Sequence, residues 1–230
     1  MTSTPGVLTR DQQLALIFET GSVQALLRHG VNQLLEVRYI NADIDPVLTT
    51  LSIGVEKLMK LTWGLLEVAA GRSWPSRTVM QEQGHGVKFL NELIGPYLGA
   101  AVGPPAQPWV QGLRDGVDSD PYWALILSAL DTYGRSGRFY YLDKLAEQPQ
   151  PWQSPRDTWD ELEQAISNDR PELLADLAGS NEGNLRARAE INAVIAASVT
   201  VWWEMIFRFW VQGAVGQFGK QHSSAINPNL

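Results

Sequence analysis

The stretch "LSIGVEKLMKLTWGLLEVAAG", residues 51–71, decides the fold class. Its apolar residues return every three or four positions, which is the spacing of one face of an α-helix. The stripe ends at Gly71, a residue type that commonly terminates helices. Upstream, Asp45 and Pro46 resemble an N-cap followed by proline in the first turn. The sequence therefore predicts a helix that begins near Asp45 and ends near Gly71.

Two glycines inside this predicted helix are unfavourable for helix formation. Gly54 and Gly64 each cost about 1 kcal/mol relative to alanine. A glycine retained at such a position indicates that another part of the chain approaches the backbone closely. We therefore expect another helix to approach this one closely at both positions.

Helical periodicity continues over residues 10–38, 76–93, 119–130, 154–178 and 185–218, and no stretch alternates convincingly as a strand does. "ETGS", residues 19–22, predicts a break with Ser22 as N-cap. "GPYLGAAVGPPAQP", residues 95–108, predicts an irregular connection with room for one helical turn. The predicted fold is an all-α antiparallel bundle of about six to eight helices. It ends in a long helix that we expect to be buried on several sides.

The domain organisation follows from length and from one proline-rich segment. A chain of 230 residues is compatible with a single helical domain over residues 1–230. Residues 1–9 and 223–230 are expected to be flexible tails. "EQPQPWQSPRD", residues 147–157, contains three prolines and is either a loop that spans the bundle or a domain boundary. The length favours the loop.

Composition excludes several classes of chemistry. The absence of cysteine excludes disulfides, thiolate metal sites and cysteine nucleophiles. The net charge of −7 disfavours broad binding to phosphate backbones. The N-terminus lacks a signal-peptide pattern. The apolar run at 193–215 is interrupted by Glu204 and Arg208, so we expect a buried helix, no membrane partner and a cytoplasmic location.

No motif for a metal or a cofactor is present in the sequence. The three histidines lack zinc or di-iron spacing, so no metal site is expected. There is no phosphate-binding loop, dinucleotide fingerprint or nucleophile elbow, so no cofactor is expected. The carboxylates of "WDELEQ", residues 159–164, have the pattern of a solvated helix face.

Three polar residues, Glu56, Lys60 and His85, form the first candidate site and are called the polar trio below. Glu56 and Lys60 lie one helical turn apart beside an apolar stripe, and His85 lies between two glycines. Antiparallel packing of the next helix would bring His85 beside them. A partly buried trio could have shifted pKa values and be catalytic. Without a nucleophile motif, a structural ion pair that fixes helix register is the favoured interpretation.

The segment "YGRSGRFYYLDKL", residues 133–145, is the second candidate. Arg135 and Arg138, interleaved with aromatic residues, could hold phosphates and stack bases. The alternative, which we favour, is that the aromatic side chains belong to the core and the arginines pair with Asp131 and Asp143.

The chain is also tryptophan-rich, with nine such residues. Trp74 and Trp152 lie in proline-rich loops and are candidates to line a groove or a dimer surface.

"LSIGVEKLMKL" followed by "GHGVKFL" resembles the HEPN-type superfamily, and "GRSGRFYYLDKL" is similar to its arginine–tyrosine segment; the likeness covers about residues 22–146. The resemblance implies an antiparallel helical bundle, often dimeric, of defence and toxin–antitoxin systems. Many members are metal-independent RNases with an Arg-x4–6-His signature at the dimer interface.

This sequence departs from that signature. Arg135 and Arg138 have no histidine downstream at the required spacing, and Arg77 precedes His85 by eight residues. The leading hypothesis is therefore a non-catalytic, homodimeric HEPN-like interaction or regulatory protein with a protein or RNA partner. One alternative is a metal-independent RNase with Arg135, Arg138 and His85 in its site. Another is a small-ligand pocket around Trp63 and His85.

Overall fold

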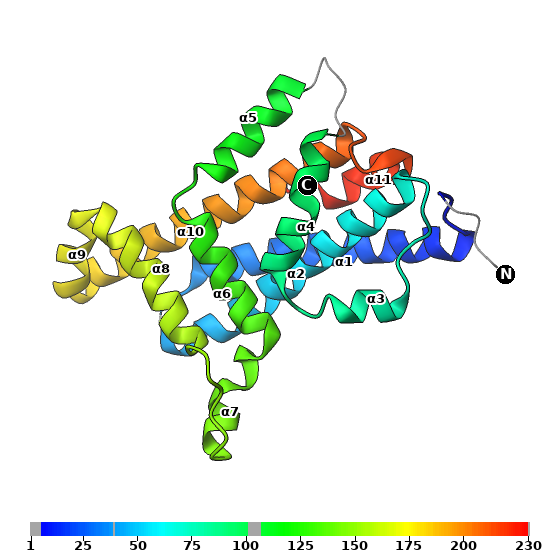
Figure 1. Cartoon of the computed structure of the whole chain (residues 1–230). Coiled ribbons are helices and arrows are strands. Elements are labelled where there is room, and N and C mark those ends of the chain that lie inside the picture. Colours follow the sequence, from blue (N-terminus) through cyan, green and yellow to red (C-terminus); the bar gives the residue numbers. More distant parts are fainter. Residues whose placement is uncertain (1–5, 39, 101–106, 230) are drawn as a thin grey trace.

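The structure, a computed structural model, describes residues 6–38, 40–100 and 107–229. These residues form eleven α-helices, two short 3-10 helices and no strand, which confirms the all-α prediction (Figure 1). The elements are α1 (Arg10–Glu36), α2 (Ile40–Ala69), α3 (Arg77–Glu82), α4 (Val87–Ala100), α5 (Gln107–Asp118), α6 (Trp123–Arg135), η1 (Gly137–Phe139), α7 (Tyr140–Leu145), α8 (Pro155–Asp169), α9 (Pro171–Ala178), α10 (Asn181–Val211), α11 (Gly216–His222) and η2 (Ser223–Ile226).

The helix count exceeds the predicted six to eight because short helices appear where the periodicity predicted parts of longer ones. Gly84, with φ of 59°, separates α3 from α4 inside the helix predicted for 76–93. Gly213 and Gly216, with φ of 81° and 79°, separate α10 from α11. Glycine adopts this left-handed conformation without steric cost, so it ends a helix that the apolar spacing alone would continue.

The helices α1 and α2 form an antiparallel hairpin in the centre of the fold. A Cβ added at Gly54 would lie 3.0 Å from Cδ2 of Leu27 in α1, and one at Gly64 would lie 2.5 Å from Cη2 of Trp74. The predicted close approach of another helix is therefore confirmed at Gly54 and is wrong at Gly64. The neighbour at Gly64 is the indole ring of Trp74, which lies in the loop after α2. The ring packs against the α2 backbone because glycine has no side chain there.

Three local predictions about helix boundaries are wrong. α1 runs unbroken through 19–22, where the Thr20 hydroxyl donates to the Leu16 carbonyl at 2.9 Å, so Ser22 is not an N-cap. α2 begins at Ile40, which places Pro46 inside the helix. Residues 95–100 belong to α4 and 107–108 to α5, while 101–106 lie outside the described residues. Tertiary packing overrides local turn signals at these positions.

α10 is the long buried C-terminal helix that the sequence predicts. Trp202 and Trp210 on it are fully buried, and Nε1 of Trp210 donates to Oγ1 of Thr62 in α2 at 3.0 Å. Within the described chain it is the one helix long and apolar enough to cross a membrane, and 61% of its apolar window is buried inside the fold. A core helix of this kind passes the same length and hydropathy test.

The predicted flexible tails contact the core where the structure describes them. Leu8 is buried and Thr9 forms a capping box with Gln12 at the start of α1. At the other end Ile226 is fully buried, and its carbonyl accepts a hydrogen bond from Nε1 of Trp203 at 2.8 Å. Leu8, Thr9 and Ile226 are therefore held by the fold, and residues 1–5 and 230 lie outside the described part.

Residues 146–154 connect α7 to α8 without helical structure. The side chain of Gln150 holds this connection against the preceding turn, donating to the Ser136 carbonyl at 3.0 Å and to Asp143. Ser154 then forms a capping box with Asp157, and Pro155 occupies the first position of α8, as the sequence predicts. The proline-rich segment is thus a loop tied to its surroundings.

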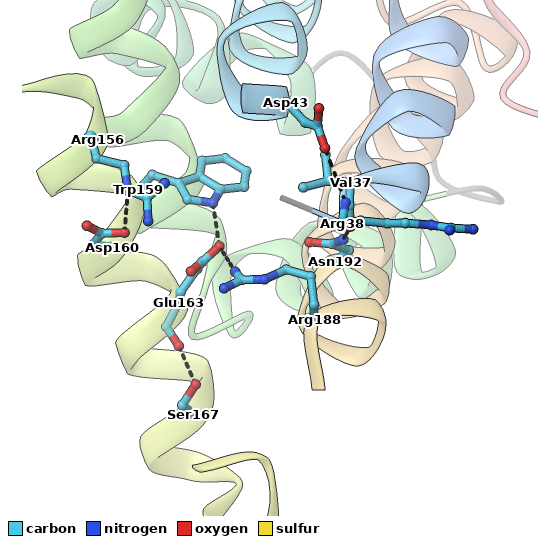
Figure 2. Close-up of polar contacts among 10 residues, drawn as sticks. All are labelled: Val37, Arg38, Asp43, Arg156, Trp159, Asp160, Glu163, Ser167, Arg188 and Asn192. Atoms are coloured by element: carbon cyan, nitrogen blue, oxygen red, sulfur yellow. Dashed lines mark hydrogen bonds and ion pairs between the residues drawn. The ribbon is translucent and has the colours of Figure 1, made fainter. Parts of the chain in front are cut away.

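A buried polar cluster joins α8 to α10 (Figure 2). Arg188 of α10 donates to Oε1 of Glu163, and Nε1 of Trp159 donates to the same oxygen at 2.8 Å. The reading of 159–164 as a solvated face holds for Asp160 and Glu161 but is wrong for Glu163. That carboxylate lies one turn after Trp159, on the face that α8 turns toward α10.

Candidate functional site

The structure brings the polar trio together between α2 and the loop that precedes α4. Nζ of Lys60 lies 2.8 Å from Oε1 of Glu56, and Nδ1 of His85 lies 2.9 Å from Oε2 of the same carboxylate. Lys60 also donates to the Gly84 carbonyl at 2.7 Å. One carboxylate and one ammonium therefore hold the Gly84–His85 loop against α2.

The local sequence explains why His85 can reach α2. Gly84 adopts a left-handed backbone conformation that turns the chain after α3, and α4 begins at Val87. Val87 is fully buried and anchors the start of α4 in the core. The imidazole is 48% exposed, whereas the Glu56 side chain is mostly buried. His85 thus presents one ring nitrogen to Glu56 and part of its ring to solvent.

Arg135 lies beside this loop, at the end of α6. A Cβ added at Gly86 would lie 2.9 Å from Nη2 of Arg135, and one at Gly134 would lie 3.2 Å from the His85 carbonyl oxygen. Nε of Arg135 forms an ion pair with Oδ2 of Asp131 at 3.2 Å. The predicted pairing of Arg135 with Asp131 is confirmed, and the structure adds that this arginine neighbours the trio.

Asp131 was predicted from the sequence only as an ion-pair partner for an arginine. Its Oδ1 accepts the backbone N–H of Lys88 at 3.0 Å, in the first turn of α4, while Oδ2 pairs with Arg135. A carboxylate at this place stabilises the helix N-terminus. The position of Asp131 one turn before Arg135 was visible in the sequence, but its contact with α4 depends on the tertiary fold.

Arg138 lies apart from the trio and Arg135. It lines a cavity of about 380 Å³ with Asp45, Tyr141 and Arg156, whereas Arg135 lines one of about 260 Å³ with Trp152. The predicted pairing with Asp143 is absent in the described residues, because that carboxylate accepts from Gln150 and Arg138 stacks over the Phe139 ring at 5.1 Å. The structure therefore divides the two arginines between two places.

Tyr133 shows that the aromatic residues of this segment are partly core, as favoured. Its ring is buried, and its hydroxyl lies 2.6 Å from Oγ1 of Thr49 and donates to Oδ2 of Asp45 at 3.1 Å. Burial raises the pKa of the Tyr133 phenol, and the nearby Asp45 carboxylate raises it further. The phenol consequently stays protonated and links α6 to α2. Tyr141 and Phe139, in contrast, are exposed.

The tryptophan predictions divide in the same way. Trp63 is buried. Five cavities of about 190 to 740 Å³ lie in the described part of the structure, and none of the five is lined by Trp63 or by the polar trio. Trp74 lines a cavity of about 190 Å³ beside α1, and Trp152 lines that of Arg135. The loop tryptophans therefore line grooves, as predicted, and the Trp63–His85 pocket has no counterpart among these cavities.

Chemically, the trio is a carboxylate–imidazole pair with the Lys60 ammonium bound to the carboxylate, and Arg135 lies beside the same loop. A carboxylate that fixes one nitrogen of an imidazole is the arrangement used to orient a general base, and an adjacent arginine can bind a phosphate. Both oxygens of Glu56 and the ammonium of Lys60 have partners within this group and its loop, and His85 is bound through Nδ1. Among the described residues, no three His, Asp or Glu side chains gather in a group that could hold a metal ion.

Comparisons of the chain with family models, curated proteins and solved structures find no match. The class of protein is therefore defined by the chain's own features: an all-α bundle in which a Glu–Lys–His trio joins α2 to the loop before α4.

Proposed function

We propose that this chain is a non-catalytic, HEPN-like helical interaction protein that forms a homodimer in the cytoplasm. Two features support the non-catalytic part. The Glu56 carboxylate is shared between Lys60 and His85, and the Lys60 ammonium is also bound to a backbone carbonyl. Groups that are mutually satisfied in this way hold elements in register, which is a structural task.

The observation that carries the interaction role is an exposed apolar arm. The arm comprises η1, α7 and the following loop, residues 137–153, and it projects from the body of the fold (Figure 1). Four of its large side chains are more than half exposed: Tyr141 at 56%, Leu142 at 61%, Trp152 at 65% and Leu145 at 81%. Large exposed apolar side chains that concentrate on one projecting segment are typical of protein–protein interfaces.

The experiment that tests the proposal is the mass of the chain in solution. Gel filtration with light scattering should give twice the chain mass of 25.5 kDa, with the dimer fraction rising with concentration. A monomeric mass at the highest concentration reached would contradict the homodimer.

A second candidate function, a metal-independent RNase, is favoured by one observation. Arg135 lies against Gly86, directly beside the His85 whose imidazole is fixed by Glu56. That neighbourhood supplies an oriented imidazole and a phosphate-binding guanidinium without a metal.

The division between the two arginines gives this candidate a matched control. Cleavage of single-stranded RNA in EDTA should be lost in Arg135→Ala and in His85→Ala, and should persist in Arg138→Ala, which changes the same charge in another cavity. No cleavage by the wild-type chain, or equal cleavage by all three variants, would remove the RNase candidate.

A further inference from the structure

The cavity that Arg138 lines combines two arginines with apolar side chains. It has a volume of about 380 Å³ and lies where the start of α2, the base of the α7 arm and the start of α8 meet. Its apolar side chains include Ile44 and Leu48, which are buried, and Tyr141 and Leu142, which are exposed. The volume lies within the range of roughly 300–1,000 Å³ that small-molecule sites occupy.

Two guanidinium groups from different elements line this cavity. Arg156 in α8 uses Nε for an ion pair with Asp160 at 2.8 Å (Figure 2), but its Nη1 is buried and has no hydrogen-bond partner in the described residues. Arg138 stacks over Phe139 and has no carboxylate within ion-pair distance in the described chain. A buried N–H donor without an acceptor is destabilising, so the protein does not fully satisfy the guanidinium of Arg156.

The one carboxylate among the lining side chains is already engaged. Oδ2 of Asp45 accepts a hydrogen bond from the Tyr133 hydroxyl, with 3.1 Å between the two oxygens. The cavity also adjoins the N-terminal turn of α8, a helix of 15 residues, where the helix dipole favours negative charge. Because Arg156 is paired with Asp160 and Asp157 caps the start of α8, the positive charge without a carboxylate partner at this cavity is that of Arg138.

We infer that this cavity binds a small organic anion, in which a phosphate or carboxylate group is attached to a flat apolar body. The planar donor forks of Arg138 and Arg156 match the oxygens of either anion. Tyr141, Leu142 and Leu48 provide apolar surface for the body of the ligand. The inference rests on the cavity and its arginines and does not depend on the RNase candidate. It shares Tyr141 and Leu142 with the arm proposed as the dimer surface, so light scattering tests the dimer separately from the titration.

The test is isothermal titration of the full chain with phenyl phosphate, benzoate and inorganic phosphate, with benzylamine as the cationic counterpart. Phenyl phosphate and benzoate should bind, inorganic phosphate more weakly because it lacks the apolar body, and benzylamine not at all. Binding should weaken as salt is added. Arg138→Gln or Arg156→Gln should lower the affinity for phenyl phosphate roughly tenfold to hundredfold, the usual effect of losing a charged hydrogen bond.

Two control variants separate recognition from stability and from net charge. Arg114→Gln removes the same charge at a different cavity, so it should leave the affinity unchanged. Asp160→Asn breaks the ion pair of Arg156 while keeping its guanidinium, so it should leave phenyl phosphate binding intact or tighten it. The inference is overturned if phenyl phosphate fails to bind the wild-type chain. It is equally overturned if the Arg138 and Arg156 variants bind like Arg114→Gln.

Discussion

Nδ1 of His85 lies 2.9 Å from Oε2 of Glu56, and this contact joins the loop before α4 to the middle of α2. Glu56→Gln removes the charge of this carboxylate and leaves one acceptor oxygen for Lys60 and His85, while Lys60 keeps its bond to the Gly84 carbonyl. We expect Glu56→Gln to lower the free energy of unfolding by about 1–2 kcal/mol. His85→Gln should cost less than about 1 kcal/mol, since the imidazole is half exposed.

Urea denaturation followed by circular dichroism measures both effects. His29→Gln is the matched control, because this histidine lies exposed on α1. If Glu56→Gln were no more destabilising than the His29 control, the trio would not hold α2 and the loop together.

Breaking the buried ion pair of Glu163 and Arg188 should lower the free energy of unfolding more than breaking an exposed ion pair. Each side chain is only 12% exposed, and Trp159 also depends on the same carboxylate. Glu163→Gln should therefore lower the free energy of unfolding by roughly 3 kcal/mol. Arg186→Gln, two residues along α10 from Arg188, breaks exposed pairs and should cost less than about 1 kcal/mol.

Denaturant melts of the two variants compare the pairs directly. A double variant, Glu163→Leu with Arg188→Met, should recover much of the loss, because it removes both buried charges at once. Equal losses for Glu163→Gln and Arg186→Gln would contradict the assignment of Glu163 to a buried contact.

Replacing glycine by alanine should change stability in opposite directions at two positions. Gly64→Ala should destabilise by about 1–3 kcal/mol, because a Cβ there would lie 2.5 Å from the Trp74 ring. Gly21→Ala should stabilise by up to about 1 kcal/mol, since it lies inside α1 and a Cβ there meets nothing within 4 Å. Thermal melts of the two variants check this, and a loss of stability in Gly21→Ala would contradict an unbroken α1.

The pH dependence of stability has a defined contribution from Glu67. Hydrogen bonds from Arg72 hold the pKa of the Glu67 carboxyl below its ordinary value, so the unfolded chain takes up this proton first as the pH falls. The contribution is full above the unfolded-state pKa of about 4.3 and is lost as pH falls through the lower folded-state pKa.

The measurement is the difference in melting temperature between the wild-type chain and Glu67→Gln at a series of pH values. The wild-type chain should melt higher at neutral pH, and the difference should shrink in acid. A difference that stays constant down to pH values well below about 4 would contradict the assigned pKa shift.

The sequence predicted what local periodicity controls. Spacing and antiparallel packing account for the face of α2, the close approach at Gly54, the capping of α8 and the convergence of His85 with Glu56 and Lys60. These features depend on one helix face or on neighbouring helices in the chain.

Features that depend on distant tertiary contacts were not predictable in this way. Glu163 has the same local pattern as its exposed neighbours, and only the arrival of α10 buries it. The separation of Arg135 from Arg138 depends on where α6 ends and on the loop before α8, and the anchoring of Ile226 depends on Trp203. Spacing along the chain carries no information about such partners.

The mass of an arm variant in solution tests the central claim most directly. Leu142→Ser with Leu145→Ser removes apolar surface from the arm, while Leu174→Ser makes a similar change on α9 and leaves the arm intact. Light scattering should show a dimer for the wild-type chain and for Leu174→Ser, and a folded monomer for the arm variant. An arm variant that remains dimeric at the same concentration would contradict the account.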